Sequence, residues 1–256
     1  MKGEHDIFNR VMPRDNIAVV TFFEERITGA RLICVNAHVH WDPAFKDVKL
    51  VQVAILMEQI SKLADKYANW PACTDKAINR LKFAEEEAKQ DPEKPTPEPG
   101  PSLEYPSGSA IPMIMCGDFN SFPDSGVCDL LAHGSLSHAH SDLEDRKYGN
   151  FTRDGMTHPF TLKSSYAAIG ELAFTNYTPN FAGVIDYIWY STNALHLTGL
   201  LGEIDREYLQ KVPGFPNYHF PSDHLALFAE FSVKPQKDKK AVEADFGSTQ
   251  REKDKR

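Results

Sequence analysis

The sequence predicts an α/β protein in which a long amphipathic helix covers a β-sheet. Residues 17–23 and 31–39 are rich in β-branched and aromatic side chains, and the polar segment between them contains a glycine, as in a hairpin turn. Between residues 47 and 67, apolar side chains recur at helical spacing with lysine and glutamate among them. These patterns predict two antiparallel strands followed by a helix that lies on the sheet.

The rest of the chain continues this mixture of strands and helices. Apolar runs predict strands near 111–115, 184–190, 194–200 and 225–233, and residues 125–133 predict a helix. Residues 84–110 differ, because a run of charged side chains is followed by closely spaced prolines. We expect a disordered insertion there, within one domain of residues 1–233, and a disordered charged tail at 234–256.

The composition is that of a chain with a sizeable core, since 41% of the 256 residues are apolar. No run approaches the roughly 18 to 20 apolar residues that cross a bilayer, and the first residues lack an apolar signal-peptide core. We therefore expect no membrane association and a cytoplasmic and nuclear location. The four cysteines show no metal-binding spacing, so reduced packing thiols are expected.

The net charge of −8 argues against non-specific binding to nucleic acid, which relies on basic side chains to neutralise phosphates. The argument is weak for this chain, because several carboxylates lie in the expected insertion and others lie in the candidate site. Divalent ions would offset the carboxylates of the site. Net charge therefore does not exclude a nucleic-acid partner.

Two short polar motifs next to apolar strands point to a functional site. Gly-Asp-Phe-Asn at 117–120 follows one apolar run, and Ser-Asp-His at 222–224 precedes another. Polar groups at the end of a buried strand are costly unless something binds them. Alternation places Asp118 and Asn120 on one face, where a carboxylate can hold a hard cation or a water and an amide can orient a phosphate oxygen. The alternative is a turn in which both residues cap their own backbone.

A second acidic position lies in the apolar strand at 184–190. A buried Asp186 requires a hydrogen-bonding partner there, and His224 is a natural one. The carboxylate would keep the imidazole protonated and oriented toward a phosphate. A contact of Asp186 with a tyrosine or with the backbone is the alternative. Together with Asp118, the pattern favours a metal-dependent phosphodiesterase.

Other polar residues are placed near these by their spacing. Asn36, His38 and His40 project to one face of the strand at 31–39, although a single strand histidine is more often structural. Asp223 is next to His224 in the sequence, and the turn set by Pro221 would let both reach one pocket.

The ordered combination of motifs is more specific than any one of them. The segments are Asn-Ala-His-Val-His-Trp-Asp-Pro at 36–43, Gly-Asp-Phe-Asn-Ser-Phe-Pro-Asp-Ser-Gly at 117–126 and Thr-Asn-Tyr-Thr-Pro-Asn-Phe-Ala-Gly-Val-Ile-Asp-Tyr at 175–187. They resemble the carbon-catabolite-repressor deadenylases, the nuclease subunits of the Not-containing deadenylation complex, within the endonuclease/exonuclease/phosphatase superfamily. The resemblance runs from Phe8 to Val233 and implies a two-sheet β-sandwich flanked by helices.

This resemblance implies an activity and a cofactor. Its members hydrolyse the last phosphodiester of a poly(A) tail from the 3′ end and release 5′-AMP, with two Mg²⁺ ions in the general two-metal scheme. The implied partners are single-stranded poly(A) RNA and the other subunits of the Not-containing complex.

The resemblance also implies roles for the catalytic positions. Asp118 matches a metal-associated aspartate that takes a proton from the attacking water, and Asn120 matches the residue that contacts the scissile phosphate. Asp186 and His224 match a coupled pair that stabilises charge on that phosphate. Asp223 matches a second carboxylate near the metals.

Substrate contacts follow in the same way. His38 matches a contact on the phosphate side, and Pro43, Asn176 and Phe181 match the positions that hold the terminal adenine. Proline and phenylalanine rings can clamp a flat base between them. The alternative for Pro43 and Phe181 is a turn and ordinary packing.

One part of the family pattern is absent from this sequence. Family members begin with strands that carry an asparagine and then a glutamate that is a principal Mg²⁺ ligand, and neither motif occurs before residue 17. Glu24 and Glu25 lie in the expected turn and cannot replace that glutamate. We expect a truncated chain that lacks the N-terminal strands and has little or no activity alone. Alternatives are another phosphodiesterase or phosphatase of the superfamily, and a non-catalytic module that binds poly(A) or protein.

Overall fold

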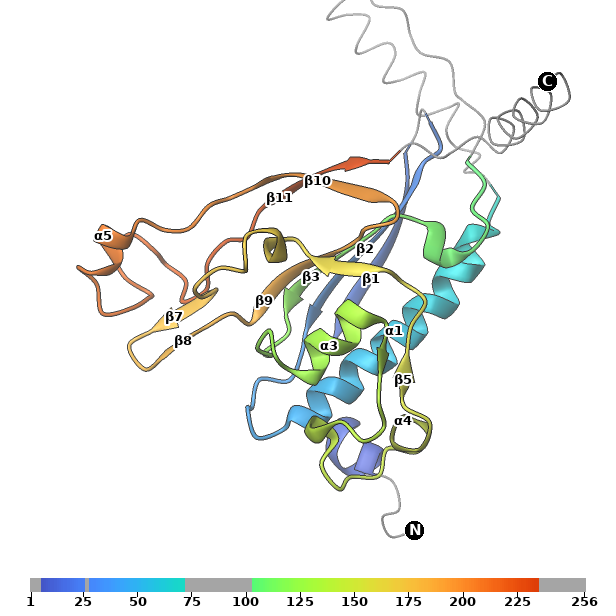
Figure 1. The fold of residues 1–256 in the computed structure, drawn as a ribbon, viewed down its shortest axis with the longest axis horizontal. Coiled ribbons are helices and arrows are strands. Elements are labelled where there is room, and N and C mark those ends of the chain that lie inside the picture. The colour runs from blue at the N-terminus through green and yellow to red at the C-terminus, as the bar shows by residue number, and fades with distance from the viewer. Residues whose placement is uncertain (1–5, 26–27, 72–102, 235–256) are drawn as a thin grey trace, which may run out of the picture.

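A mixed sheet of five strands is the largest element of the computed structural model, which describes residues 6–25, 28–71 and 103–234 (Figure 1). In spatial order its strands are β1 (Ala18–Glu24), β2 (Arg31–His38), β3 (Met113–Asp118), β9 (Asp186–Ser191) and β6 (Leu162–Ser164). β2 and β3 run parallel, whereas the other neighbouring strands run antiparallel. The hairpin expected at residues 17–39 is confirmed.

Smaller elements surround this sheet. The helices are α1 (Lys46–Ala68), α3 (Gly126–His133), α4 (Asn150–Arg153) and α5 (Arg206–Leu209), with single turns η1 (Ile7–Val11), η2 (Gly108–Ala110), η3 (Ser141–Leu143) and η4 (Tyr166–Ala168). Three two-stranded sheets pair β4 (Ser135–Leu136) with β5 (Met156–Thr157), β7 (Asn176–Thr178) with β8 (Phe181–Gly183), and β10 (Leu195–Leu200) with β11 (Ala229–Val233). The helices expected at 47–67 and 125–133 are confirmed as α1 and α3.

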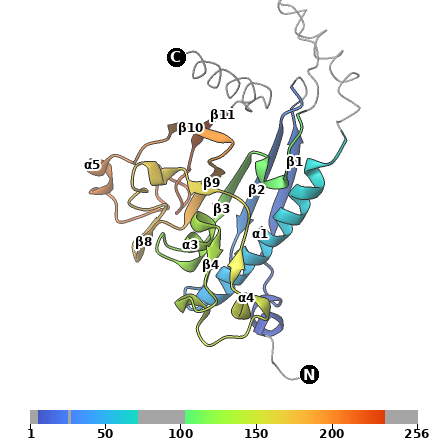
Figure 2. The same cartoon turned by 45° about the vertical axis from the view of Figure 1, so that its right-hand side comes forward.

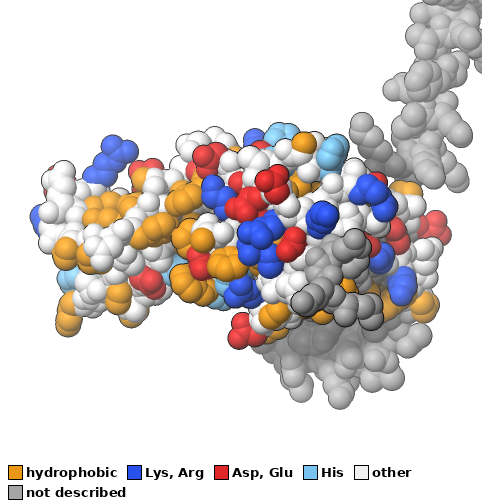
Figure 3. All heavy atoms as spheres, turned by 90° about the horizontal axis from the view of Figure 1, so that it is seen from below, with side chains coloured by type: hydrophobic (Ala, Val, Ile, Leu, Met, Phe, Trp, Pro, Cys, Tyr) orange, Lys and Arg blue, Asp and Glu red, His pale blue; other side chains and the backbone are white. Residues whose placement is uncertain are grey.

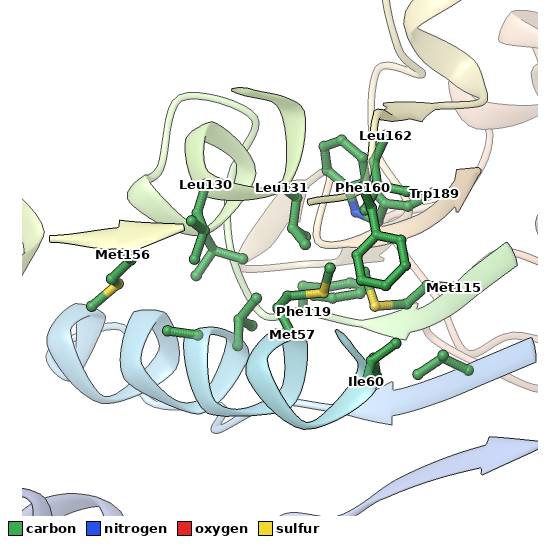
Figure 4. Close-up of a cluster of buried hydrophobic side chains, with 14 of the residues drawn as sticks. Met57, Ile60, Met115, Phe119, Leu130, Leu131, Met156, Phe160, Leu162 and Trp189 are labelled. Carbon is green, nitrogen blue, oxygen red and sulfur yellow. The ribbon is translucent and has the colours of Figure 1, made fainter. Parts of the chain in front are cut away.

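The core lies between the five-stranded sheet and the helices α1 and α3. Figure 2 shows α1 running along β1 and β2. Because strand side chains alternate, Ile33 of β2 and Met115 of β3 point toward α1, where they are buried. Figure 4 shows Met57 of α1 beneath Leu131 of α3 in this cluster. Burial of one face of the sheet leaves the opposite face for other uses.

The opposite face is covered in part by the β10–β11 pair. The rings of Tyr190 on β9 and Phe231 on β11 lie 5.0 Å apart, so this second sheet packs over β9. Val19 and Phe23 of β1 remain 58% and 50% exposed. The expected two-sheet arrangement with flanking helices is therefore built from sheets of unequal size. The strand expected at 225–233 begins at Ala229.

An ion pair between the half-buried Arg10 and the buried Asp47 holds η1 against the start of α1. The guanidinium of Arg10 donates from Nε and Nη2 to the two carboxylate oxygens of Asp47 at 2.8 and 2.9 Å, and the Tyr148 hydroxyl donates to the same group. Burial raises the pKa of Asp47, but these hydrogen bonds outweigh it and hold the pKa below its usual value. The Arg10 guanidinium also lies 4.7 Å from the centre of the Phe45 ring, so it steadies the loop between β2 and α1.

The insertion expected at residues 84–110 is described only in part. Residues 84–102 lie outside the described residues, and residues 103–110 are described. From residue 103 onward the chain packs on the body of the protein. The Tyr105 hydroxyl accepts the Arg31 N–H at 2.9 Å, and the Gly108 N–H donates to Asp65 of α1 at 2.9 Å. Packing therefore begins before Ile111. The expected disordered tail lies outside the described residues from position 235.

The cysteines that the structure describes are all free. Cys34, Cys116 and Cys128 form no disulfide, and burial raises the pKa of each thiol, to about 11 for Cys128. The expectation of reduced packing thiols is confirmed for these three, and Cys73 lies outside the described residues. Within the described ranges, no helix combines the length and apolarity needed to span a membrane.

Candidate active site

Three neighbouring strands place polar side chains in one row at the edge of the sheet. His38 ends β2, Asp118 ends β3 and Asp186 begins β9. The register pairs His38 with Asp118 and Asp118 with Asp186, on the face turned away from α1. His38 Nε2 lies 3.6 Å from Asp118 Oδ2. The hydrogen-bond ladder of the sheet thus sets the spacing of the site.

His224 closes this row from a distant part of the chain. Its Nδ1 donates to Asp186 Oδ2 at 2.9 Å, and its Nε2 lies 4.0 Å from Asp118 Oδ2. An isolated antiparallel bridge between Asn176 and His224 holds the backbone there. Burial lowers the pKa of His224, but the hydrogen bond to Asp186 and the charges of nearby aspartates raise it above its usual value overall. The expected pairing of Asp186 with His224 is observed, with an imidazole biased toward its charged form.

The two carboxylate oxygens of Asp118 have different neighbours, one in the turn and one in the site. Its Oδ1 accepts the Asn120 N–H at 2.8 Å, while its Oδ2 faces His38 and His224. Burial and the charge of Asp186 raise the pKa of Asp118. Close packing of two carboxylates is unfavourable without a compensating positive charge, so a cation or a protonated histidine would stabilise this group.

Asn120 is fixed by a buried lysine that sequence reasoning missed. Lys49 of α1, only 5% exposed, donates from Nζ to the Asn120 carbonyl at 2.6 Å. The Asn120 side chain donates from Nδ2 to the Val39 carbonyl at 3.0 Å, and its φ of 47° is in the left-handed region. Burial lowers the pKa of Lys49. The strand alternation expected from Asp118 to Asn120 therefore ends at Asp118, where β3 stops.

Thr175 is a second residue that the sequence did not single out. Its hydroxyl donates to Asp186 Oδ2 at 2.7 Å and accepts the N–H groups of Ile185 and Asp186 at 2.9 and 3.0 Å. The side chain is buried. Its carbonyl accepts the Leu225 N–H at 2.7 Å, next to His224. Thr175 therefore fixes both members of the Asp186–His224 pair.

A candidate metal centre shares only Asp118 with the expected ligands, which were Asp118 and Asp223. Asp118, Asp186 and His224 each offer a ligand atom, and these atoms lie within 4.8 Å of one another. Asp223, the other expected ligand, is not in this group, and its carboxylate accepts a hydrogen bond from Asn176 Nδ2 at 3.2 Å. Two carboxylates in one group suit a hard cation such as Mg²⁺. Among the described residues, the carboxylate that joins Asp118 is that of Asp186.

A cavity of about 380 Å³ adjoins this row. The expected adenine-binding residues Pro43, Asn176 and Phe181 all line it, together with Asn120 and His224. The other lining residues are Trp41, Lys46, Lys49, Ser121, Phe122, Asp124, Ser125, Val127, Asp142 and Ile185. The structure thus brings the expected adenine-binding residues to one concave surface, whereas His38, the expected contact on the phosphate side, is not among the residues that line it.

His40 and the two glutamates of the first hairpin lie elsewhere. His40 is buried after β2 has ended, so it does not share a face with His38, and its ring packs against Phe45 with centroids 5.3 Å apart. Glu24 pairs with Arg31 at 3.5 Å, and Glu25 accepts the Thr28 N–H in the turn. Both glutamates lie at the opposite end of β1 from the row.

The surface charge is mixed on the face shown in Figure 3. Acidic and basic side chains lie next to one another over its central part, and apolar side chains gather toward the end that carries β7 and β8. This face therefore offers no broad basic track for a phosphate backbone.

Comparison with known proteins finds a matching family and similar proteins. Residues 88–224 match the Endonuclease/Exonuclease/phosphatase family. The CCR4-Not complex 3′-5′-exoribonuclease subunit Ccr4 of Phaeosphaeria nodorum is 64% identical over 247 residues, covering 96% of this chain and 41% of the relative. The protein of the same name from Aspergillus terreus is 63% identical over 246 residues, covering 96% of this chain and 36% of the relative. These matches confirm the resemblance that the motifs indicate, although the chain spans only 41% or less of these two relatives.

Solved structures share the fold. The crystal structure of ANGEL2, a 2′,3′-cyclic phosphatase, in complex with adenosine-2′,3′-vanadate superposes with a TM-score of 0.60 at 25% identity, covering 87% of this chain and 62% of that one. The human nocturnin catalytic domain superposes with a TM-score of 0.50 at 19% identity, covering 86% and 54%. These superpositions confirm the expected fold class.

Proposed function

The chain belongs to the endonuclease/exonuclease/phosphatase family, and from this premise we propose that it carries catalytic residues of a poly(A)-specific 3′–5′ exoribonuclease. The supporting observation is the Asp186–His224 hydrogen bond of 2.9 Å, with Asp118 within 4.0 Å of the same imidazole, beside the cavity. In the proposed reaction water hydrolyses the last phosphodiester of a poly(A) tail, and the product is 5′-AMP.

Each site residue has its own role in the proposed reaction. Asp118 accepts a proton as the oxygen of water forms its bond to phosphorus. The bond between phosphorus and the 3′ oxygen breaks, and this oxygen leaves with the shortened RNA and takes up a proton from solvent as its new 3′ hydroxyl. His224, kept charged and oriented by Asp186, donates a hydrogen bond to the phosphate as negative charge builds up on it. His38, at the end of β2, and Asn120, in the loop after β3, contact the phosphate in this proposal.

Mg²⁺ is the proposed cofactor, since the donor set of Asp118 and Asp186 is rich in carboxylate oxygens. When bound, Mg²⁺ supplies positive charge that polarises the phosphate and lowers the pKa of the attacking water. We propose two ions, with Asp223 as a further carboxylate. Isothermal titration calorimetry counts them, and an Asp118→Asn variant with unchanged stoichiometry would exclude Asp118 as a ligand.

The substrate is single-stranded, because stacking of a base on Phe181 and Pro43 requires a base that is free of pairing. We propose, from its similarity to the named subunits, that the chain works with the other subunits of the CCR4-Not complex. A cytoplasmic and nuclear location stays a prediction from the sequence.

The test is release of 5′-AMP from oligoadenylate with Mg²⁺. The 256-residue chain alone is expected to give little or no product, so the variants are compared in a longer chain of the relatives' length that contains the same residues. Asp118→Asn and His224→Gln are expected to reduce the rate about 10²- to 10⁴-fold, as for loss of general acid-base groups. His133→Gln, an exposed histidine on α3, is the matched control and is expected to keep the parent rate. Parent rates in both site variants would contradict the proposal.

A second candidate is phosphatase activity on another phosphate ester. The 25% identity and TM-score of 0.60 to ANGEL2, named as a 2′,3′-cyclic phosphatase, favour it. Hydrolysis of adenosine 2′,3′-cyclic phosphate without release of 5′-AMP from oligoadenylate would select this candidate. Binding of oligoadenylate that needs no Mg²⁺ and yields no product would indicate a non-catalytic module.

A further inference from the structure

A pair of phenylalanine rings forms one wall of the cavity. The ring centroids of Phe122 and Phe181 lie 6.0 Å apart with their planes inclined by 29°. Phe122 is 46% exposed and Phe181 is 38% exposed, and both line the cavity. An aromatic pair that stays half exposed beside a cavity has apolar surface available to a flat ligand. We call these two rings the aromatic wall.

The two rings come from separate elements that are each held in place. Phe181 begins β8, which pairs with β7 through Thr178. Phe122 lies in the loop from β3 to α3, where the Tyr187 hydroxyl donates to the Ser121 carbonyl at 2.8 Å and the Ser125 N–H donates to the Phe122 carbonyl at 3.0 Å. The aromatic wall therefore joins the loop after Asp118 to the β7–β8 hairpin.

The two rings of the aromatic wall pack closely against residue 183, which is a glycine and has no side chain. A Cβ atom at this position would lie 2.5 Å from Cε1 of Phe122 and 3.0 Å from Cζ of Phe181. No other residue type fits there without moving a ring. Gly183 also lies opposite Asn176 in the β7–β8 register, so the close approach occurs at the lining of the cavity.

We propose that Phe122 is a specificity-determining residue, which sets the plane of the Phe181 ring so that a purine base stacks on it in preference to a pyrimidine. This inference rests on the proposed function and adds a residue to its site. A purine has a larger flat area than a pyrimidine, so stacking contributes more to its binding free energy. Binding of a purine is therefore weakened more when the Phe181 ring is free to tilt. Pro43 lines the same cavity as Phe181 and Phe122.

The experiment compares binding of oligoadenylate and oligouridylate to the 256-residue chain by fluorescence anisotropy at one salt concentration. Phe122→Leu keeps an apolar side chain but removes the ring, and Phe122→Tyr keeps the ring as the matched control. We expect Phe122→Leu to raise the Kd for oligoadenylate about tenfold and the Kd for oligouridylate by less than about threefold. Phe122→Tyr is expected to retain the parent ratio.

Gly183→Ala is a second variant, which displaces the aromatic wall without removing a ring. It is expected to reduce the preference for oligoadenylate in the same direction as Phe122→Leu. Thermal unfolding of every variant shows whether the fold is retained. If Phe122→Leu does not fold, Gly183→Ala and the ratio of the two Kd values decide the question.

The outcomes separate this inference from the proposed function. A parent chain that prefers oligoadenylate, with Phe122→Leu and Gly183→Ala keeping the full preference, overturns the role of Phe122 and leaves the proposed function standing. A parent chain without any preference overturns both. A loss of preference in both variants, with the Tyr variant unchanged, supports the inference.

Discussion

The two faces of the five-stranded sheet use the same strands for opposite purposes. Toward α1, β2 and β3 present Ile33 and Met115, which are buried in the core. Away from α1, the ends of the same strands present His38 and Asp118 in register with Asp186. The apolar face supplies the stability, whereas the polar face gathers groups whose proximity costs stability. A site built on strand ends of a packed sheet is held rigidly, as a site for phosphate chemistry requires.

The largest expected effect is a loss of stability on truncation of a core side chain, compared with truncation of a more exposed side chain on the same helix. Met57→Ala in α1 removes a fully buried side chain and should lower the free energy of unfolding by about 2–5 kcal/mol. Leu63→Ala, on the same helix but 40% exposed, is the matched control, with a change within roughly 0.5 kcal/mol. Chemical denaturation measures both. Equal losses in the two variants would show that α1 is not held by this face.

A smaller effect is expected on the polar face at Thr175. Thr175→Val keeps the shape of the side chain but removes the hydroxyl that bonds Asp186 and two backbone N–H groups. The free energy of unfolding should therefore fall by about 1–3 kcal/mol. Thr175→Ser retains the hydroxyl and should recover most of this loss. If the Val variant is as stable as the Ser variant, the hydroxyl does not hold the Asp186–His224 pair.

The smallest expected effect is a pH dependence of the polar face. The pKa values of His224 and Asp118 are both raised in the folded chain, so folding favours their protonated forms. Their contribution is fully present below the unfolded values, 6.5 for His224 and 3.8 for Asp118, and is lost as pH rises through the folded values. The metal-free chain should therefore lose stability as pH rises above about 6.5, through His224.

Thermal unfolding across this pH range, with and without Mg²⁺, measures the effect. His224→Gln should flatten the profile, and Mg²⁺ should stabilise the parent chain more at the higher pH, where His224 is neutral. A profile that is unchanged by His224→Gln would assign the pH dependence to other groups.

Local patterns were sufficient for much of the fold. The period of two in β2 and the helical spacing in α1 predicted those elements to within one or two residues, because each pattern records which face is buried. The Asp118 and His224 motifs were recognisable because polar groups beside apolar strands need a partner. His40 was misplaced because the alternation was continued past the end of β2.

Other site residues gave no comparable local signal. Lys49 resembles any lysine on an amphipathic helix, and only the position of Lys49 between Val48 and Leu50, both buried, hints at burial. Thr175 is one of many threonines, and its contact with Asp186 depends on how the segment before β7 meets β9. Phe122 lies in a polar loop, and its contact with the Phe181 ring depends on the position of the β7–β8 hairpin.

The sequence by itself determined the order of the motifs, the alternation that separates the two faces, and the residue types from which a phosphate site can be made. Only the tertiary structure decided the register that aligns His38, Asp118 and Asp186, and the bridge that brings His224 to them. It also decided that Asp223 bonds Asn176 while Asp186 joins Asp118. The reason is physical: alternation and periodicity act between near neighbours in the chain, whereas register and closure depend on hydrogen bonds between segments far apart in it.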